Sequence, residues 1–154
     1  MNSKFETLYN QLPEILNSIQ GNESPEWGSM HLIQMLKHVT TGFETSLSYQ
    51  EFEIVTPEEK VPAFQRFLMS DKPLVRNAKI PHSYHKISEP DHLELKEVKE
   101  RFLDQLRLLK KEMDENAEYW SVHPDFGRLD ADQTAQLHYK HIRHHFIQFG
   151  IIKE

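Results

Sequence analysis

The chain has 154 residues, enough for one domain with its own core, and it carries a net charge of −6 and no cysteine. The acidic balance argues against general nucleic-acid binding, which needs clustered Lys and Arg, and the lack of cysteine excludes disulfides and thiolate ligands. No apolar run is long enough to span a membrane, and the N-terminus lacks a basic segment followed by an apolar one. We therefore expect a single cytoplasmic domain over residues 1–154.

Four segments have apolar residues at every third or fourth position, the spacing of one helix face. They cover residues 3–20, 29–49, 91–116 and 131–149. Pro13 is a local defect in the first segment, Ser29 is the expected N-cap of the second, and Asp130 with Gln133 predicts a capping box before the last. No segment alternates apolar and polar residues long enough to predict a sheet. The expected fold class is all-α.

A long proline-containing connection separates the second predicted helix from the third. Residues 51–90 hold five prolines and one short apolar patch, PAFQRFLM, which predicts one or two turns of helix. His82, His85 and His92, in or beside this connection, are read as solvated loop residues. Four long helices with one long crossover favour a four-helix bundle.

Histidines crowd the last predicted helix. The stretch LHYKHIRHHFIQFG holds four of the chain's ten histidines. At about 100° per residue, His138, His141 and His145 fall within an arc of roughly 60°, whereas His144 points away from that arc. His141 and His145 are four residues apart, a helical spacing at which two imidazoles can reach one metal ion. The stretch therefore predicts a stripe of metal-ligating side chains.

The second predicted helix offers a facing imidazole. His38 lies at the edge of the apolar arc made by Leu32, Met35, Leu36, Val39 and Phe43, and His31 lies on nearly the same line as His38. Packed side by side, the two helices would close a metal site from His38, His141 and His145, with an open position for water or substrate. Three neutral ligands leave a divalent ion its full charge, so that it can act as a Lewis acid.

Other interpretations of these histidines remain open. Histidine runs on helices of acidic proteins also arise by chance or as pH-sensing surfaces. A zinc-protease motif is disfavoured, because Ile142 stands where that motif has its catalytic glutamate. His123, before Pro124, is expected in a loop that could lie near the mouth of the site.

Three segments carry a resemblance to a known superfamily. WGSMHLIQMLKHV, VHPDFGRLDADQ and LHYKHIRHHFIQFG resemble signature segments of an uncharacterised branch of the DinB superfamily, the damage-inducible, YfiT-like helical proteins. The resemblance implies an up-down-down-up four-helix bundle, usually dimeric. It also implies a divalent metal, commonly nickel or zinc, on His38, His141 and His145. His31 and His138 are then candidates to support these ligands from behind, and His144 is an addition to the triad.

The expected function is a metal-dependent enzyme, a thiol S-transferase or a hydrolase acting on a small metabolite or xenobiotic. The resemblance also suggests a low-molecular-weight thiol as a cofactor; the chain itself has none. The alternative is a non-catalytic metal- or ligand-binding bundle in a stress response. Expected partners are a small-molecule substrate and a second copy of the chain, joined through apolar residues such as Ile33 and Leu47, with neither nucleic acid nor membrane.

Overall fold

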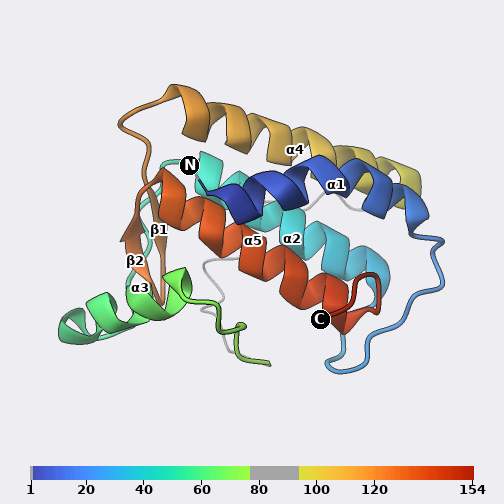
Figure 1. Ribbon diagram of the computed structural model, residues 1–154, viewed down its shortest axis with the longest axis horizontal. Coiled ribbons are helices and arrows are strands. Elements are labelled where there is room, and N and C mark those ends of the chain that lie inside the picture. The colour runs from blue at the N-terminus through green and yellow to red at the C-terminus, as the bar shows by residue number, and fades with distance from the viewer. Residues whose placement is uncertain (1, 77–93) are drawn as a thin grey trace.

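The computed structural model describes residues 2–76 and 94–154 and is mostly helical (Figure 1). The helices, in chain order, are α1 (Ser3–Ser18), α2 (Leu32–Leu47), the short 3₁₀ helix η1 (Glu58–Lys60), α3 (Val61–Met69), α4 (Leu95–Glu115) and α5 (Ala131–Gln148). Two short strands, β1 (Ser121–His123) and β2 (Gly127–Leu129), lie between α4 and α5. None of the described helices combines the length and the apolarity needed to cross a lipid bilayer.

The long helices begin where side chains satisfy their free backbone N–H groups. Asp130 and Gln133 form the predicted capping box of α5, with each side chain bonded to the other's backbone. The second helix differs from the prediction, because its N-cap is His31 and not Ser29. The His31 imidazole accepts from the backbone N–H of Gln34, and the Gln34 side chain accepts from the backbone of His31. Helix α2 therefore starts two residues later than a Ser29 N-cap predicts.

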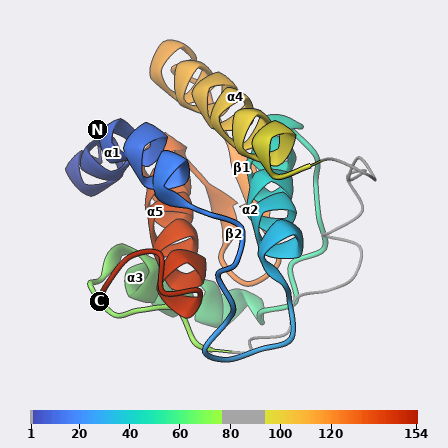
Figure 2. The same cartoon turned by 90° about the vertical axis from the view of Figure 1, so that its right-hand side faces the viewer.

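The core lies among α1, α2, α4 and α5, which pack against one another along their apolar faces (Figure 2). Phe43, Phe102 and Phe146, from three different helices, are completely buried there. Phe43 meets Phe102 edge to face, and Phe146 stacks on Phe102. The predicted amphipathic faces are therefore confirmed as the buried ones, and α4 spans the core as expected.

A β-hairpin corrects the expectation of no sheet. β1 and β2 pair antiparallel, with His123 opposite Gly127. The turn between them is three residues long and ends at Gly127, whose φ of +72° favours glycine. Three-residue strands are too short for an alternating pattern to be visible in the sequence. The hairpin matters because it carries His123 and Asp125 to the side of α2 and α5.

The connection after α2 is partly ordered against the hairpin. The patch PAFQRFLM is helical, as predicted, and lies within α3. The Gln65 side chain donates to the backbone carbonyls of Phe126 and Arg128, which ties α3 to the hairpin. The Lys140 ammonium donates to the carbonyl of Phe67 and ties the end of α3 to α5. His82, His85, His92 and the predicted helix start at 91 lie outside the described residues.

Candidate metal centre

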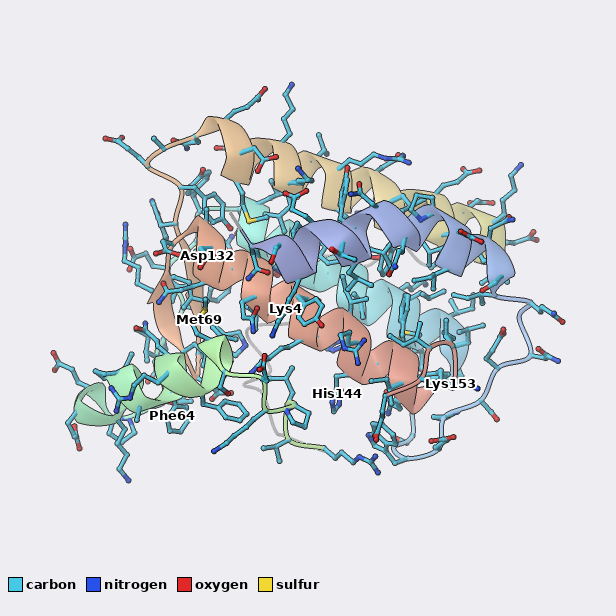
Figure 3. All side chains as sticks on the ribbon, viewed as in Figure 1. Lys4, Phe64, Met69, Asp132, His144 and Lys153 are labelled. Carbon is cyan, nitrogen blue, oxygen red and sulfur yellow. The ribbon has the colours of Figure 1, made fainter. Side chains whose placement is uncertain are left out.

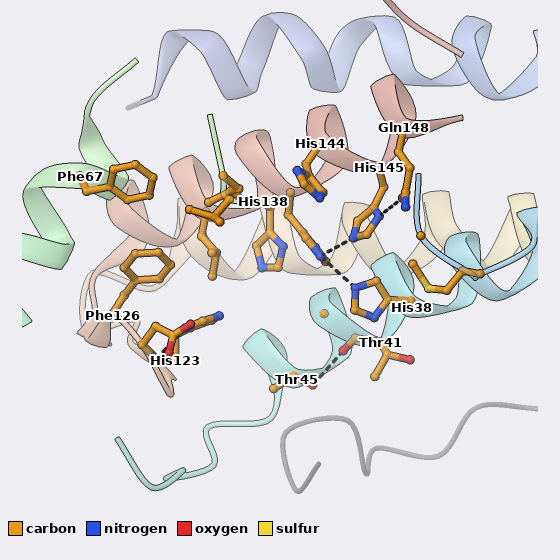
Figure 4. Close-up of a pocket in the computed structure, with 18 of the residues that line it drawn as sticks. His38, Thr41, Thr45, Phe67, His123, Phe126, His138, His144, His145 and Gln148 are labelled. Carbon is orange, nitrogen blue, oxygen red and sulfur yellow. Dashed lines mark hydrogen bonds between the residues drawn. The ribbon is translucent and has the colours of Figure 1, made fainter. Parts of the chain in front are cut away.

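The structure brings together the three histidines that the sequence singled out. The Nε2 atom of His141 lies 3.0 Å from Nε2 of His38 and 3.1 Å from Nε2 of His145 (Figure 4). The three ligand atoms lie within 4.8 Å of one another. Because α5 turns by one revolution between His141 and His145, both rings face α2, where His38 projects toward them. This cluster, the triad, could hold one metal ion.

A glutamine fixes the protonation pattern of one triad member. The Gln148 Nε2 group donates to the backbone carbonyl of Trp27 at 2.8 Å, so its Oε1 faces the other way and lies 2.7 Å from Nδ1 of His145. An amide oxygen only accepts, and therefore the His145 proton sits on Nδ1. This leaves the Nε2 lone pair of His145 directed at the other two imidazoles, as a metal ligand requires.

The loop before α2 has a glycine where Gln148 needs space. Gly28 has a φ of +80°, and a Cβ at this position would lie 2.7 Å from the Gln148 amide nitrogen. The backbone N–H of Glu26 also donates to the backbone carbonyl of Gln148. The segment before α2 is thus shaped around the end of α5, which holds Gln148 against His145.

Protons alone leave the triad incompletely paired. With its Nε2 lone pair fixed, His145 cannot donate to His141 through that atom. If His141 carries its proton on Nε2, that N–H can make a well-aligned hydrogen bond to only one of its two neighbours. If the proton is on Nδ1 instead, the Nε2 lone pairs of His141 and His145 face each other at 3.1 Å. One short N···N pair therefore stays without a good hydrogen bond. A divalent cation would satisfy all three lone pairs at once, so the donor set fits a metal.

Burial keeps the imidazoles on α5 neutral. It holds the pKa of His141 well below its ordinary value and lowers the pKa of His145 to about 4, although the hydrogen bond to Gln148 opposes the second shift. Neutral imidazole is the form that binds a metal, so these ligands remain available at neutral pH.

His138 lies one turn before His141 but contacts a different partner. Its Nε2 atom lies 2.7 Å from the Ser46 hydroxyl, and its Nδ1 is buried without a hydrogen-bond partner in the described part of the chain. Burial, with the nearby His123, lowers the pKa of His138 to about 3. No hydrogen bond between His138 and the triad is found among the described residues. Its predicted support of the ligands is therefore limited to packing beside them.

Two other histidines also have defined places. His31 is exposed at the N-cap of α2, and its ring binds Gln34 and no triad member. His144, expected to point off the stripe, is half-buried and meets Trp27 edge to face. Its ring also contacts the ring of His145, next to it in Figure 4. It stays outside the cluster that could hold a metal.

The triad opens into a pocket of about 860 Å³. Its lining includes α2 and α5 beside the triad, the segment from Trp27 to Met30, part of α3, and the hairpin turn with His123 and Asp125. His123 is buried at the end of β1, and so the expected loop residue is a strand residue at the pocket wall. Burial raises the pKa of Asp125. The pocket falls within the size range of small-molecule sites.

The family model for a protein of unknown function, DUF1569, matches residues 1–150. The chain belongs to the DUF1569 family. Neither a curated protein nor a solved structure matches it. In this DUF1569 chain the candidate centre therefore stands on its own geometry.

Sequence reasoning missed several residues of the candidate site in this chain. Gln148 had a local signal, because it lies three residues after His145 and so on the same side of α5. Gly28, Trp27 and Asp125 had none, since they reach the site only through contacts between distant segments.

We expect Gln148→Leu to weaken metal binding by about 10- to 100-fold, the usual cost of losing the partner that orients a ligand. Leucine roughly preserves the side-chain volume but cannot accept a hydrogen bond from Nδ1 of His145. The metal affinity is measured by competition with a chromogenic chelator. The control is Gln136→Leu, because Gln136 is another buried glutamine on α5. An unchanged metal affinity in Gln148→Leu would show that the Gln148 amide does not support a metal ligand.

We expect the metal-free protein to lose stability as the pH falls from about 6.5 to about 4. The pKa values of His138 and His145 are lower in the folded chain than the ordinary 6.5, so the unfolded chain binds more protons in this window. Each group contributes at most about 1.4 kcal/mol per pH unit. Urea unfolding across this range should show a smaller slope for His138→Asn. The control Leu108→Ser replaces an exposed, uncharged side chain and should leave the slope as in the parent; equal slopes in all three proteins would contradict this account.

Proposed function

We propose that this protein is a metal-dependent enzyme that uses His38, His141 and His145 to activate a nucleophile against a small electrophilic substrate. The observation that carries the proposal is the convergence of three imidazole nitrogens at the wall of a pocket of about 860 Å³. A metal whose only task was to brace the fold would be closed off by a fourth protein ligand. Among residues 2–76 and 94–154 the triad supplies three ligands, and all three line the pocket.

A divalent ion held by three neutral imidazoles would act as a Lewis acid that lowers the pKa of a coordinated water or thiol. The protein's own residues contribute position and environment. Gln148 holds His145 in one tautomer, and the mostly apolar pocket reduces competition from bulk water. Asp125 and His123 lie in the same pocket and can exchange protons with a bound substrate.

The nucleophile is either water, which makes the protein a hydrolase, or a low-molecular-weight thiol, which makes it a thiol S-transferase. The thiol alternative is favoured by the resemblance of three sequence segments to DinB and YfiT-like proteins. Membership of that superfamily, its up-down-down-up four-helix bundle and its preference for nickel or zinc are part of this proposal. The chain has no cysteine, so the thiol would come from solution.

The test compares two reactions of the same metal-loaded protein. Conjugation of a chloronitrobenzene to a small thiol reports transferase activity, and hydrolysis of a nitrophenyl ester reports hydrolase activity. Activity in one reaction that disappears in His141→Ala and persists in His31→Asn supports the proposal. A metal-loaded protein inert toward a broad panel of electrophiles, with and without thiols, favours a non-catalytic metal- or ligand-binding protein.

We also propose a homodimer. Ile33 and Leu47 are half-buried on α2, so each retains apolar surface that a second copy can cover. Equilibrium sedimentation at micromolar concentration should give twice the chain mass, and Ile33→Glu should shift the mass toward that of one chain. A parent protein that sediments only as a monomer contradicts this proposal.

A further inference from the structure

The part of the pocket away from the triad is a compartment with apolar walls. α3 contributes Phe64 and Phe67, the segment after it contributes Leu74 and Val75, and the hairpin turn and α5 add Phe126 and Leu137. Figure 4 shows Phe67 and Phe126 together at the opposite end of the pocket from His145. We refer to these six residues as the α3 compartment.

Two residues of this compartment expose large apolar side chains to water. Phe64 is 39% exposed and Val75 is 69% exposed, although both line the pocket (Figure 3 labels Phe64). Apolar surface in contact with water is costly, and the cost is recovered when an apolar ligand covers it. The wall is also held in position, because α3 is bonded to the hairpin through Gln65 and to α5 through Lys140.

The charges around the compartment select against a highly charged ligand. Within the described part of the chain, no Lys or Arg lines the pocket, and Asp125 is its one carboxylate. Arg76 stacks over the ring of Trp27, which lines the pocket, and is paired with Glu154 at 3.7 Å. A ligand body with several charges would find no counter-ions in the lining, whereas an uncharged apolar body needs none.

We propose that the α3 compartment binds the uncharged apolar body, aromatic or aliphatic, of a substrate whose single oxygen- or sulfur-containing head lies at the triad. The substrate class is thus an apolar compound with one polar head, not a small highly charged metabolite. The head assignment rests on the proposed metal-dependent function. The body assignment rests on the compartment alone.

The experiment uses a series of hydroxamic acids on the cobalt-loaded protein. Acetohydroxamic acid has the metal-binding head with almost no body, and the butano-, hexano- and 4-phenylbutano-hydroxamic acids add apolar length. Binding is followed by the visible absorption of cobalt. We expect the affinity to rise about fourfold for each buried methylene.

Variants separate the compartment from general hydrophobicity. Phe64→Ser and Val75→Ser should each reduce the rise in affinity with chain length, expressed relative to acetohydroxamic acid binding in the same variant. Leu108→Ser is the matched control, because Leu108 is 52% exposed on α4 and does not line the pocket. In Leu108→Ser, the rise in affinity with the chain length of the hydroxamic acid should equal that of the parent protein.

A parallel titration distinguishes the failure of the compartment from the failure of the metal centre. Binding of 4-phenylbutanol and ethanol to the metal-free protein is measured by calorimetry, which needs no metal. If acetohydroxamic acid shifts the cobalt spectrum but longer bodies add no affinity, the compartment is overturned and the metal centre stands. If cobalt does not bind but 4-phenylbutanol binds far more tightly than ethanol, in a manner sensitive to Phe64→Ser, the compartment stands and the proposed metal chemistry fails.

Discussion

Replacing His141 by alanine is expected to lower the affinity for a divalent metal at least about 100-fold, more than the loss of a supporting residue would. His141 is the central member of the triad, with its Nε2 atom within 3.1 Å of both other ligand atoms. His38→Ala and His145→Ala should have effects of similar size. The measurement is metal analysis of tag-free protein at about one ion per chain in the parent, followed by chelator competition.

His144→Ala is the matched control for His145→Ala. The two residues are adjacent and their rings are in contact, but only His145 directs a ring nitrogen at the other two ligands, His38 and His141. We expect His144→Ala to change metal affinity only slightly. Equal losses at the two positions would show that the ligands are chosen wrongly, and full metal occupancy in the double variant His141→Ala with His145→Ala would end the proposal of a metal centre.

Chelation of the metal is expected to abolish the enzymatic activity while the far-ultraviolet circular dichroism stays nearly unchanged. The triad lies at the wall of a pocket, whereas the core of α1, α2, α4 and α5 is apolar and includes fully buried residues such as Phe102 and Ile142. Burial of that core supplies the main favourable contribution to folding. The melting temperature should therefore fall only modestly.

The control for chelation is His141→Ala, whose melting temperature should not respond to the chelator. Restoring the metal to the chelated parent should restore activity. Outright loss of helicity on metal removal would instead assign the metal a structural role, as in small domains that fold only with their ion.

The sequence alone determined the helices and the pairing of His141 with His145, because both depend on local periodicity. A spacing of three or four residues defines the face of a helix whatever the rest of the chain does, and it placed Phe102 in the core and His141 with His145 on one stripe. His38 could be added because it borders the apolar face that α2 turns toward its neighbours. The capping box of Asp130 and Gln133 was likewise visible, since its members are three residues apart.

Only the tertiary structure decided what surrounds the triad. The carbonyl of Trp27, more than a hundred residues away in sequence, fixes the orientation of the Gln148 amide. That orientation in turn places the proton of His145 on Nδ1. The start of α2 moved from Ser29 to His31, and the preceding segment, including Gly28, packs against the end of α5. The hairpin escaped detection because three-residue strands are stabilised by their partner and by the contacts of β1 with α2, not by a pattern of their own. The pocket exists only where these segments meet, so its shape depends on long-range packing that no local spacing encodes.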